Sequence, residues 1–241
     1  MASTANGEFR PAIIVVDMQE DFCPPKGALA VQGGRDIAPL INKLLSRSGF
    51  VVKIATQDFH PKSHISFAAN HPGPNNKPFE SVIELSNPAP GKTHETKRQR
   101  LWPVHCVQNS PGAEIIPEID TNKIDLFVLK GMDERVEMYS AFADAFGNKR
   151  CAETGAVNVD LEEELRSRRV TDVFVVGIAG DYCVKYTALD AVVCGFKVWV
   201  IEEGVKCVDE RAGWDCAKDE MAAAGVRIIH ADAPELAAVV E

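Results

Sequence analysis

Three ionisable side chains that follow predicted buried strands could together carry out nucleophilic chemistry. Cys183 lies in the first turn of a predicted helix, after an apolar strand and a turn of small residues. The unpaired N–H groups and positive dipole end there favour a thiolate over a thiol and could hold an oxyanion. A free helix cysteine is more often a small buried side chain, but this strand–turn–helix position favours a nucleophile.

Asp17 and Lys130 also follow predicted strands and are placed to meet the sulfur of Cys183. A carboxylate whose pKa is raised by burial can accept the thiol proton, and an ammonium group stabilises the neighbouring anions. Taken singly, Asp17 is explained as a turn cap and Lys130 as a surface lysine. Because all three residues come at strand ends, the joint interpretation as acid, amine and nucleophile is favoured.

A second group of residues is suited to binding a metal ion. Asp58 and His60 are two residues apart after a predicted strand, so that carboxylate and imidazole can converge on one ion. His105, further along the chain, would complete a three-ligand set with open positions. Three further histidines could be ligands, partners of ligands or surface residues: His64, His71 and His94.

The elements that must position these side chains alternate between buried strands and helices. Apolar runs predict strands at 11–16, 50–55, 124–129, 173–176, 197–201 and 226–229. Helical spacing predicts helices at 35–46, 161–169, 181–195, 214–224 and 234–240. The alternation predicts an α/β, three-layer Rossmann-like fold with a mostly parallel six-stranded sheet covered by helices on both faces. Ligands of such sheets bind beyond the carboxyl ends of the strands, at the switch point in strand order.

Length and composition indicate a single globular domain spanning residues 1–241. Residues 1–8 are small and polar and are expected to form a flexible tail, and residues 64–100 are expected to form a long insertion near the active site. The net charge of −9 disfavours nucleic acid and anionic membranes as partners. The seven scattered cysteines, without a secretory signal, favour reduced thiols in a cytoplasmic setting, and no apolar run is long enough to span a membrane.

With these residues in view, the chain resembles the nicotinamidases of the isochorismatase-like cysteine hydrolase family. The resemblance covers nearly the whole chain, from about residue 11 to residue 229. Its acid, lysine and cysteine elements belong to the wider family, whereas the Asp-x-His and Trp-Pro-x-His-Cys elements point to metal-containing nicotinamidases. The motifs that carry it are DMQEDF (17–22), TQDFHP (56–61), WPVHC (102–106), KG (130–131) with YSAF (139–142), and GIAGDYCV (177–184).

The resemblance implies a role for several residues. Asp17, Lys130 and Cys183 would form a catalytic triad, and Asp58, His60 and His105 would hold a divalent metal, commonly Zn2+ in this family. The Ile178–Ala179 peptide would be cis, with the N–H groups of Ala179 and Cys183 forming an oxyanion hole. The residues implied to contact the substrate are Phe22, Trp102, Tyr139 and Ala179.

The resemblance also implies an activity. It implies hydrolysis of nicotinamide to nicotinate and ammonia in NAD salvage, through a cysteine thioester, by an enzyme that forms homo-oligomers. Whether analogues such as pyrazinamide are also substrates does not follow from the sequence. Two alternatives stay open at this point. One is another amidase of the same fold acting on an N-carbamoyl or ureido compound, and the other is a catalytically silent binding module.

Overall fold

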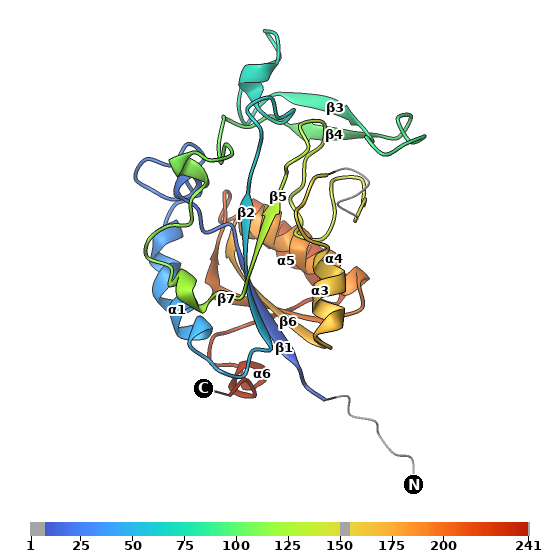
Figure 1. Ribbon diagram of the computed structural model, residues 1–241. Helices are drawn as coiled ribbons and strands as arrows, with labels where there is room; N and C mark the ends of the chain where they lie inside the picture. The colour runs from blue at the N-terminus through green and yellow to red at the C-terminus, as the bar shows by residue number, and fades with distance from the viewer. Residues whose placement is uncertain (1–7, 150–154, 241) are drawn as a thin grey trace.

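The computed structural model describes residues 8–149 and 155–240 of the chain. At its centre is a sheet of six strands in the order β5-β2-β1-β6-β7-β8, in which every neighbouring pair is parallel (Figure 1). The prediction of a six-stranded parallel sheet is therefore confirmed. The strands are β1 (Pro11–Val16), β2 (Val52–Asp58), β5 (Leu126–Lys130), β6 (Asp172–Ile178), β7 (Lys197–Lys206) and β8 (Arg227–Ile229).

Helices cover both faces of this sheet. On one face lies α1 (Ala38–Leu45), and on the other lie α3 (Leu161–Ser167), α4 (Lys185–Val193) and α5 (Ala212–Ala224) (Figure 1). The short α6 (Pro234–Ala237) packs its apolar side chains into the same core as α1. Each face of the sheet therefore has its own hydrophobic core.

Strand β1 shows why these sequences form central strands. All six of its residues are buried, and successive side chains enter opposite cores: Ile13 and Val15 pack with α1, whereas Ile14 and Val16 pack with the other helices. A strand that faces two cores must be apolar at every position, because its side chains alternate between the two faces. This is the continuous run that the sequence shows.

Several predicted boundaries were wrong by a few residues. Strand β2 continues to Asp58 and β7 to Lys206, because each is extended by pairing with its neighbour at the carboxyl end. The predicted helix 35–46 begins with a 3₁₀ turn at Gly34–Ile37, and the predicted helix 234–240 ends at Ala237. The predicted helix 181–195 is a π-helical turn, Gly180–Val184, followed by α4.

The 64–100 segment contains more regular structure than the sequence predicted. A short 3₁₀ helix at Ala68–Asn70 is followed by an antiparallel ribbon of β3 (Val82–Ser86) and β4 (Thr96–Arg100). The ribbon lies beyond the carboxyl ends of β2 and β5 (Figure 1). It therefore stands on the side of the sheet where the chemistry was expected.

Two further expectations concern the chain as a whole. Apart from Glu8, the predicted flexible tail at residues 1–8 lies outside the described residues. Within 8–149 and 155–240, no helix is both long and apolar enough to cross a membrane.

Candidate active site

Four ionisable side chains meet at the carboxyl ends of four adjacent strands. Lys130 ends β5, Asp58 ends β2, Asp17 follows β1, and Cys183 lies in the turn after β6. From β1 the chain builds the sheet outward to β2 and β5, and it returns to the other side of β1 with β6. The four residues therefore flank the switch point in strand order, where ligands bind in sheets of this kind.

The ammonium group of Lys130 lies at the centre of this cluster. Its Nζ is 2.9 Å from Oδ2 of Asp17 and 3.6 Å from Sγ of Cys183, and it also donates to Oδ1 of Asp58. A fourth contact, at 3.3 Å, is made with the carbonyl oxygen of Met138. Lys130 is completely buried, so these contacts replace the water that a lysine normally binds.

Burial governs the protonation of Asp17 and Cys183. It raises the pKa of the Asp17 carboxyl, although the charge of Lys130 opposes this effect. Burial likewise raises the pKa of the Cys183 thiol well above its usual range; the charge of Lys130 opposes this shift, and the carboxylates of Asp17 and Asp58 add to it. The thiolate expected from the position at the helix start is therefore opposed by burial, which favours the protonated thiol. The sulfur needs a proton acceptor, and Asp17 stands beside it.

The local backbone aims Asp17 at this cluster. Asp17 has a left-handed φ of 48°, which turns the chain away from the direction of β1 directly after the strand. Thr56 fixes this turn, because its hydroxyl donates to Oδ1 of Asp17 while its carbonyl accepts from the Asp17 N–H at 3.2 Å. One carboxylate oxygen of Asp17 is thus held by Thr56 and the other by Lys130.

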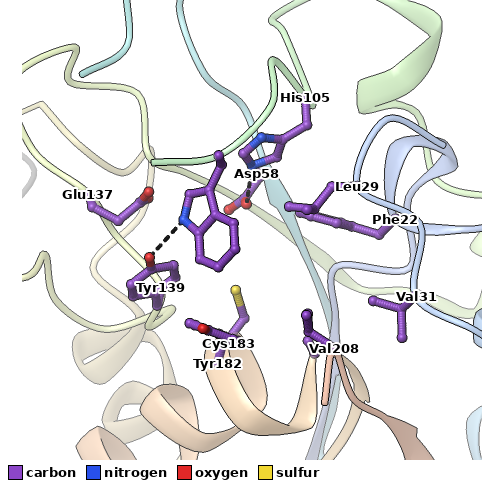
Figure 2. A pocket seen from close by; sticks show the side chains of 12 residues that line it. Phe22, Leu29, Val31, Asp58, His105, Glu137, Tyr139, Tyr182, Cys183 and Val208 are labelled. Carbon is purple, nitrogen blue, oxygen red and sulfur yellow. Dashed lines mark hydrogen bonds and ion pairs between the residues drawn. The ribbon is translucent and has the colours of Figure 1, made fainter. Parts of the chain in front are cut away.

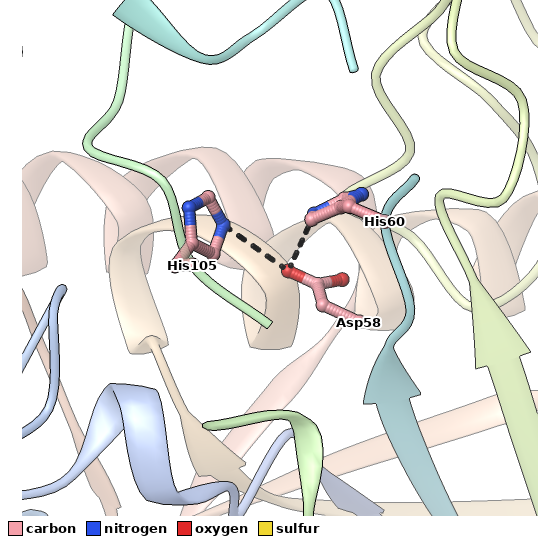
Figure 3. A group of neighbouring side chains, drawn as sticks. All are labelled: Asp58, His60 and His105. Carbon is pink, nitrogen blue, oxygen red and sulfur yellow. Dashed lines mark ion pairs between the residues drawn. The ribbon is translucent and has the colours of Figure 1, made fainter. Parts of the chain in front are cut away.

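Asp58, His60 and His105 form a second group directly beside the first. Oδ2 of Asp58 lies 3.4 Å from Nε2 of His60 and 3.8 Å from Nε2 of His105 (Figure 3). All three side chains are buried, and one candidate ligand atom from each lies within 4.8 Å of the other two. Asp58 therefore belongs to both groups, since its other oxygen accepts from Lys130.

The two imidazoles are oriented as metal ligands usually are. Nδ1 of His60 is 2.8 Å from the Gly131 carbonyl oxygen, and Nδ1 of His105 is 2.8 Å from the Pro103 carbonyl oxygen. A proton on each Nδ1 leaves each Nε2 with a free lone pair. Nε2 of His60 is buried without a hydrogen-bond partner among the described residues. Buried polar atoms are normally paired, so this nitrogen is suited to binding a cation. The donor set of one carboxylate and two imidazoles suits Zn2+.

Gly131 makes the close approach of His60 possible. A Cβ at this position would lie 2.4 Å from Cε1 of the His60 ring, and the residue has a φ of 67°. Only glycine combines that conformation with that space. The Lys-Gly pair at the end of β5 therefore supplies the central ammonium and the carbonyl that orients His60.

The remaining histidines lie in different surroundings. His64 is buried, with Nδ1 2.8 Å from the Ser66 hydroxyl and Nε2 3.1 Å from the Val136 carbonyl. Burial lowers its pKa well below the usual value, so it is neutral. It also groups with His60 and Glu137 in a second set of possible ligand atoms. His71 approaches the Ile65 carbonyl oxygen at 2.6 Å, and His94 is exposed.

Both groups open into one pocket. The four residues that the sequence analysis linked to substrate, Phe22, Trp102, Tyr139 and Ala179, all line it, together with Cys183, Asp58 and His105 (Figure 2). Five further lining residues were not predicted from the sequence: Leu29, Val31, Glu137, Tyr182 and Val208. Tyr182 could have been found as the neighbour of Cys183, and Val208 only once β7 was known to continue to Lys206.

Aromatic side chains form one wall of this pocket. The indole Nε1 of Trp102 donates to the Tyr139 hydroxyl at 2.9 Å, and Gln99 donates to the same hydroxyl at 2.7 Å (Figure 2). The ring of Tyr182 lies 5.1 Å from that of Trp102 and 5.5 Å from that of Tyr139. Such a wall is suited to packing against a flat aromatic ligand.

The turn that carries Cys183 is closed on itself. The peptide between Ile178 and Ala179 is cis, as expected. The Ala179 carbonyl accepts from the N–H groups of Tyr182 at 3.0 Å and Val184 at 3.1 Å. These bonds hold Ala179 against the first turn before α4, beside the sulfur.

The sequence of this chain is similar to that of a known protein family and of a curated relative. A family model described as "Isochorismatase domain" matches residues 11–233. A nicotinamidase of Acinetobacter baylyi is 39% identical over 218 residues, which cover 90% of this chain and 91% of that protein.

Two solved structures are similar over nearly their whole length. The yeast nicotinamidase Pnc1p bound to the inhibitor nicotinaldehyde has a TM-score of 0.81 and 31% identity, covering 91% of this chain and 99% of that one. A pyrazinamidase of Pyrococcus horikoshii in complex with zinc has a TM-score of 0.69 and 32% identity, covering 92% of this chain and 99% of that one.

Proposed function

The chain belongs to the isochorismatase domain family, and on this premise we propose that it hydrolyses nicotinamide to nicotinate and ammonia. One observation carries the proposal: an aromatic-lined pocket is lined by Cys183, whose sulfur has a buried acid and amine as neighbours, and by Asp58 and His105 of the set of one carboxylate and two imidazoles. The first set suits attack on an amide carbon, and the second suits an ion that holds a ring nitrogen.

We propose Asp17, Lys130 and Cys183 as the catalytic residues. The Cys183 proton passes to Asp17 as the sulfur bonds to the amide carbon, and Lys130 stabilises the negative charge beside it. The main-chain N–H groups of Ala179 and Cys183 stabilise the oxyanion. The carbon–nitrogen bond then breaks, and ammonia leaves with the proton that Asp17 held.

Water completes the cycle. Asp17 accepts a proton from water as the water oxygen adds to the thioester carbon, and the sulfur leaves and regains that proton. Nicotinate is released and the thiol is restored. The raised pKa of the Asp17 carboxyl suits it to accept and return a proton in both halves of the reaction.

We propose Asp58, His60 and His105 as the residues that hold the metal, with zinc as its identity. When bound, this ion supplies a Lewis-acidic position for the pyridine nitrogen. Phe22 and His105 have rings 5.4 Å apart, and with Trp102 and Tyr139 they orient the substrate ring. This orientation fixes the carboxamide relative to the sulfur, and positioning of this kind lowers the barrier.

The compartment, the domain organisation and the assembly of the chain are also proposals. We propose a cytoplasmic enzyme, because the six cysteines in the described part of the chain are free thiols. We propose one catalytic domain, because both groups draw on strands spread from β1 to β6. Self-association, which the family resemblance implies, is tested by sedimentation of the purified protein.

A substrate comparison tests the proposed function. Zinc-loaded protein should release ammonia and nicotinate in equal amounts from nicotinamide, and far less ammonia from benzamide, which lacks the ring nitrogen. Preferred hydrolysis of an N-carbamoyl or ureido compound would instead favour the other amidase reaction. Absence of ammonia release from every amide would favour a binding module.

A further inference from the structure

Gln19 has no part in the mechanism above, yet its side chain is completely buried beside both groups. Its Oε1 accepts from the main-chain N–H of Asp58 at 2.8 Å. Its Nε2 donates to the main-chain carbonyl of Asp58 at 2.8 Å and to that of Ala113 at 2.9 Å. One amide side chain therefore binds both main-chain groups of a proposed metal ligand.

The hydrogen bonds of Gln19 to Asp58 continue the β1–β2 ladder beyond the last main-chain pair of these two strands. Strands β1 and β2 pair up to Val15 and Ala55, and the last main-chain bond joins the Asp17 N–H to Thr56. The main chain then turns away at Asp17, so β1 offers no partner to Asp58. The Gln19 amide supplies the acceptor and the donor that a longer β1 would have supplied. On its other side, Asp58 is paired with Lys130 of β5.

We propose that Gln19 is a positioning residue for Asp58 and thereby for the bound metal. The proposal rests on the proposed ligand set. The Asp58 carboxylate is divided between Lys130 and the two imidazoles, so a shift of its main chain would disturb all of these contacts together. An extended, doubly paired main chain holds the carboxylate in place.

The same turn also holds the second ligand segment. Asp21, two residues after Gln19, accepts from the N–H of Cys106 at 2.7 Å, and Cys106 directly follows His105. The 17–22 turn thus contacts both chain segments that carry proposed ligands. Gln19 is the member that binds a ligand residue itself.

Gln57 offers a matched control for general loosening of this region. Its Nε2 donates to the same Ala113 carbonyl, at 2.8 Å, but its side chain donates to no atom of Asp58 in the described part of the chain. Gln57→Met therefore removes a comparable hydrogen bond to the 111–116 segment. It leaves the Asp58 main chain hydrogen-bonded to Gln19.

Zinc affinity, measured without reference to turnover, tests the proposal. Chelator-treated wild-type, Gln19→Met and Gln57→Met proteins are titrated with Zn2+ against a competing indicator, and folding is followed by circular dichroism. Gln19→Met should raise the zinc dissociation constant about 10- to 100-fold, the usual effect of losing a residue that supports a metal ligand. Gln57→Met should stay within about twofold of the wild type by the same reasoning.

Each other result overturns the proposal in a different way. Wild-type affinity in folded Gln19→Met would show that Gln19 does not position Asp58. Equal weakening by Gln57→Met would assign the effect to the Ala113 segment. Absence of zinc binding by the wild-type protein would remove the ligand set itself. If Gln19→Met does not fold, Gln19→Asn, which keeps the amide but shortens its reach, should show the same weakening, and unchanged affinity there would count against the proposal.

Discussion

Asp17, Lys130 and Cys183 extend from the ends of parallel strands or the turns directly after them, whereas His60 and His105 lie in loops beyond the sheet. The first side of the pocket inherits its geometry from the sheet ladder. The second is held by short contacts between loops, such as the isolated parallel bridge in which the His60 N–H donates to the Cys106 carbonyl at 3.0 Å and the Gln108 N–H donates to the His60 carbonyl at 2.9 Å. The side of the pocket with Asp17, Lys130 and Cys183 (the covalent side) is therefore fixed by the fold. The side with His60 and His105 (the ion side) depends on individual side-chain and loop contacts.

Removing the nucleophile should have the largest effect and should leave the ion side intact. Cys183→Ala should lower the turnover number by at least about 10⁴-fold, since Cys183 is the one cysteine that lines the pocket in the described part of the chain. Zinc content, measured by elemental analysis, should not change. Cys216→Ala, at an exposed thiol, is the matched control and should keep wild-type turnover. Substantial turnover by Cys183→Ala would rule out the thioester route.

Removing the proton acceptor should be the next most severe change. Asp17→Asn should lower the turnover number by about 10³-fold, because general acid–base catalysis typically contributes 10²- to 10⁴-fold. The amide can still accept from Thr56, so the turn itself should persist. Steady-state ammonia release checks this prediction. A variant that keeps most of its turnover would assign proton transfer to another group.

Removing a proposed metal ligand from a loop should weaken the binding of the ion and of the substrate. His60→Ala should weaken zinc binding by more than about 100-fold, which exceeds the usual effect of losing a supporting residue. The KM for nicotinamide should rise steeply, because the ion anchors the ring. Equilibrium dialysis and initial rates measure the two effects. An unchanged KM with a lower turnover number would instead indicate that the ion activates water.

A substitution in the aromatic wall should reduce activity less than a substitution in the catalytic residues or the proposed metal ligands. Tyr139→Phe removes the hydroxyl that accepts from Trp102 and Gln99, and this leaves two donors without their partner. The KM should rise about tenfold, which corresponds to roughly 1.4 kcal/mol of ring binding, because Trp102 and Gln99 without their shared acceptor no longer hold the wall in position. Initial rates over a range of nicotinamide concentrations check this. A lower turnover number at unchanged KM would place Tyr139 in the chemical step.

A change far from both sides should affect stability alone. The Asp160 carboxylate caps α3 by accepting from the Glu163 N–H at 3.1 Å. Asp160→Ala should lower the free energy of unfolding by about 1 kcal/mol, measured by urea denaturation, without changing turnover. Asp160→Asn, which keeps a capping oxygen, should lie close to the wild type. Loss of turnover in Asp160→Ala would mean that the site is coupled to that helix.

The contrast between strand ends and loops also explains which features could be predicted from the sequence. The bounds of β1 agree residue by residue with the prediction, because burial on both faces demands an unbroken apolar run that ends at Asp17. Strand β4 was missed because four of its five residues are exposed and polar, so its pairing with β3 leaves no apolar pattern.

Within the site, the residues at strand ends were predicted from local pattern, and Phe22, Trp102 and Tyr139 were predicted from the family motifs that contain them. The walls formed by residues outside those motifs were not predicted. Leu29 and Val208 reach the pocket only through tertiary packing, which no local pattern records. The burial of Cys183, which opposes the predicted thiolate, could not be predicted for a related reason. Helix position can be read along the chain, whereas the burial that raises the thiol pKa depends on the assembled molecule.

The position of β1 between β2 and β6 has a consequence for synthesis of the chain. Once residue 130 has emerged from the ribosome, β1, β2 and β5 can pair, but the opposite edge of β1 has no neighbour until β6, at Asp172–Ile178, is made. That open edge is apolar on both faces, and such an edge recruits strands from other chains. A polypeptide released before residue 172 is therefore expected to aggregate, and chaperone protection would be needed most between the translation of β5 and that of β6.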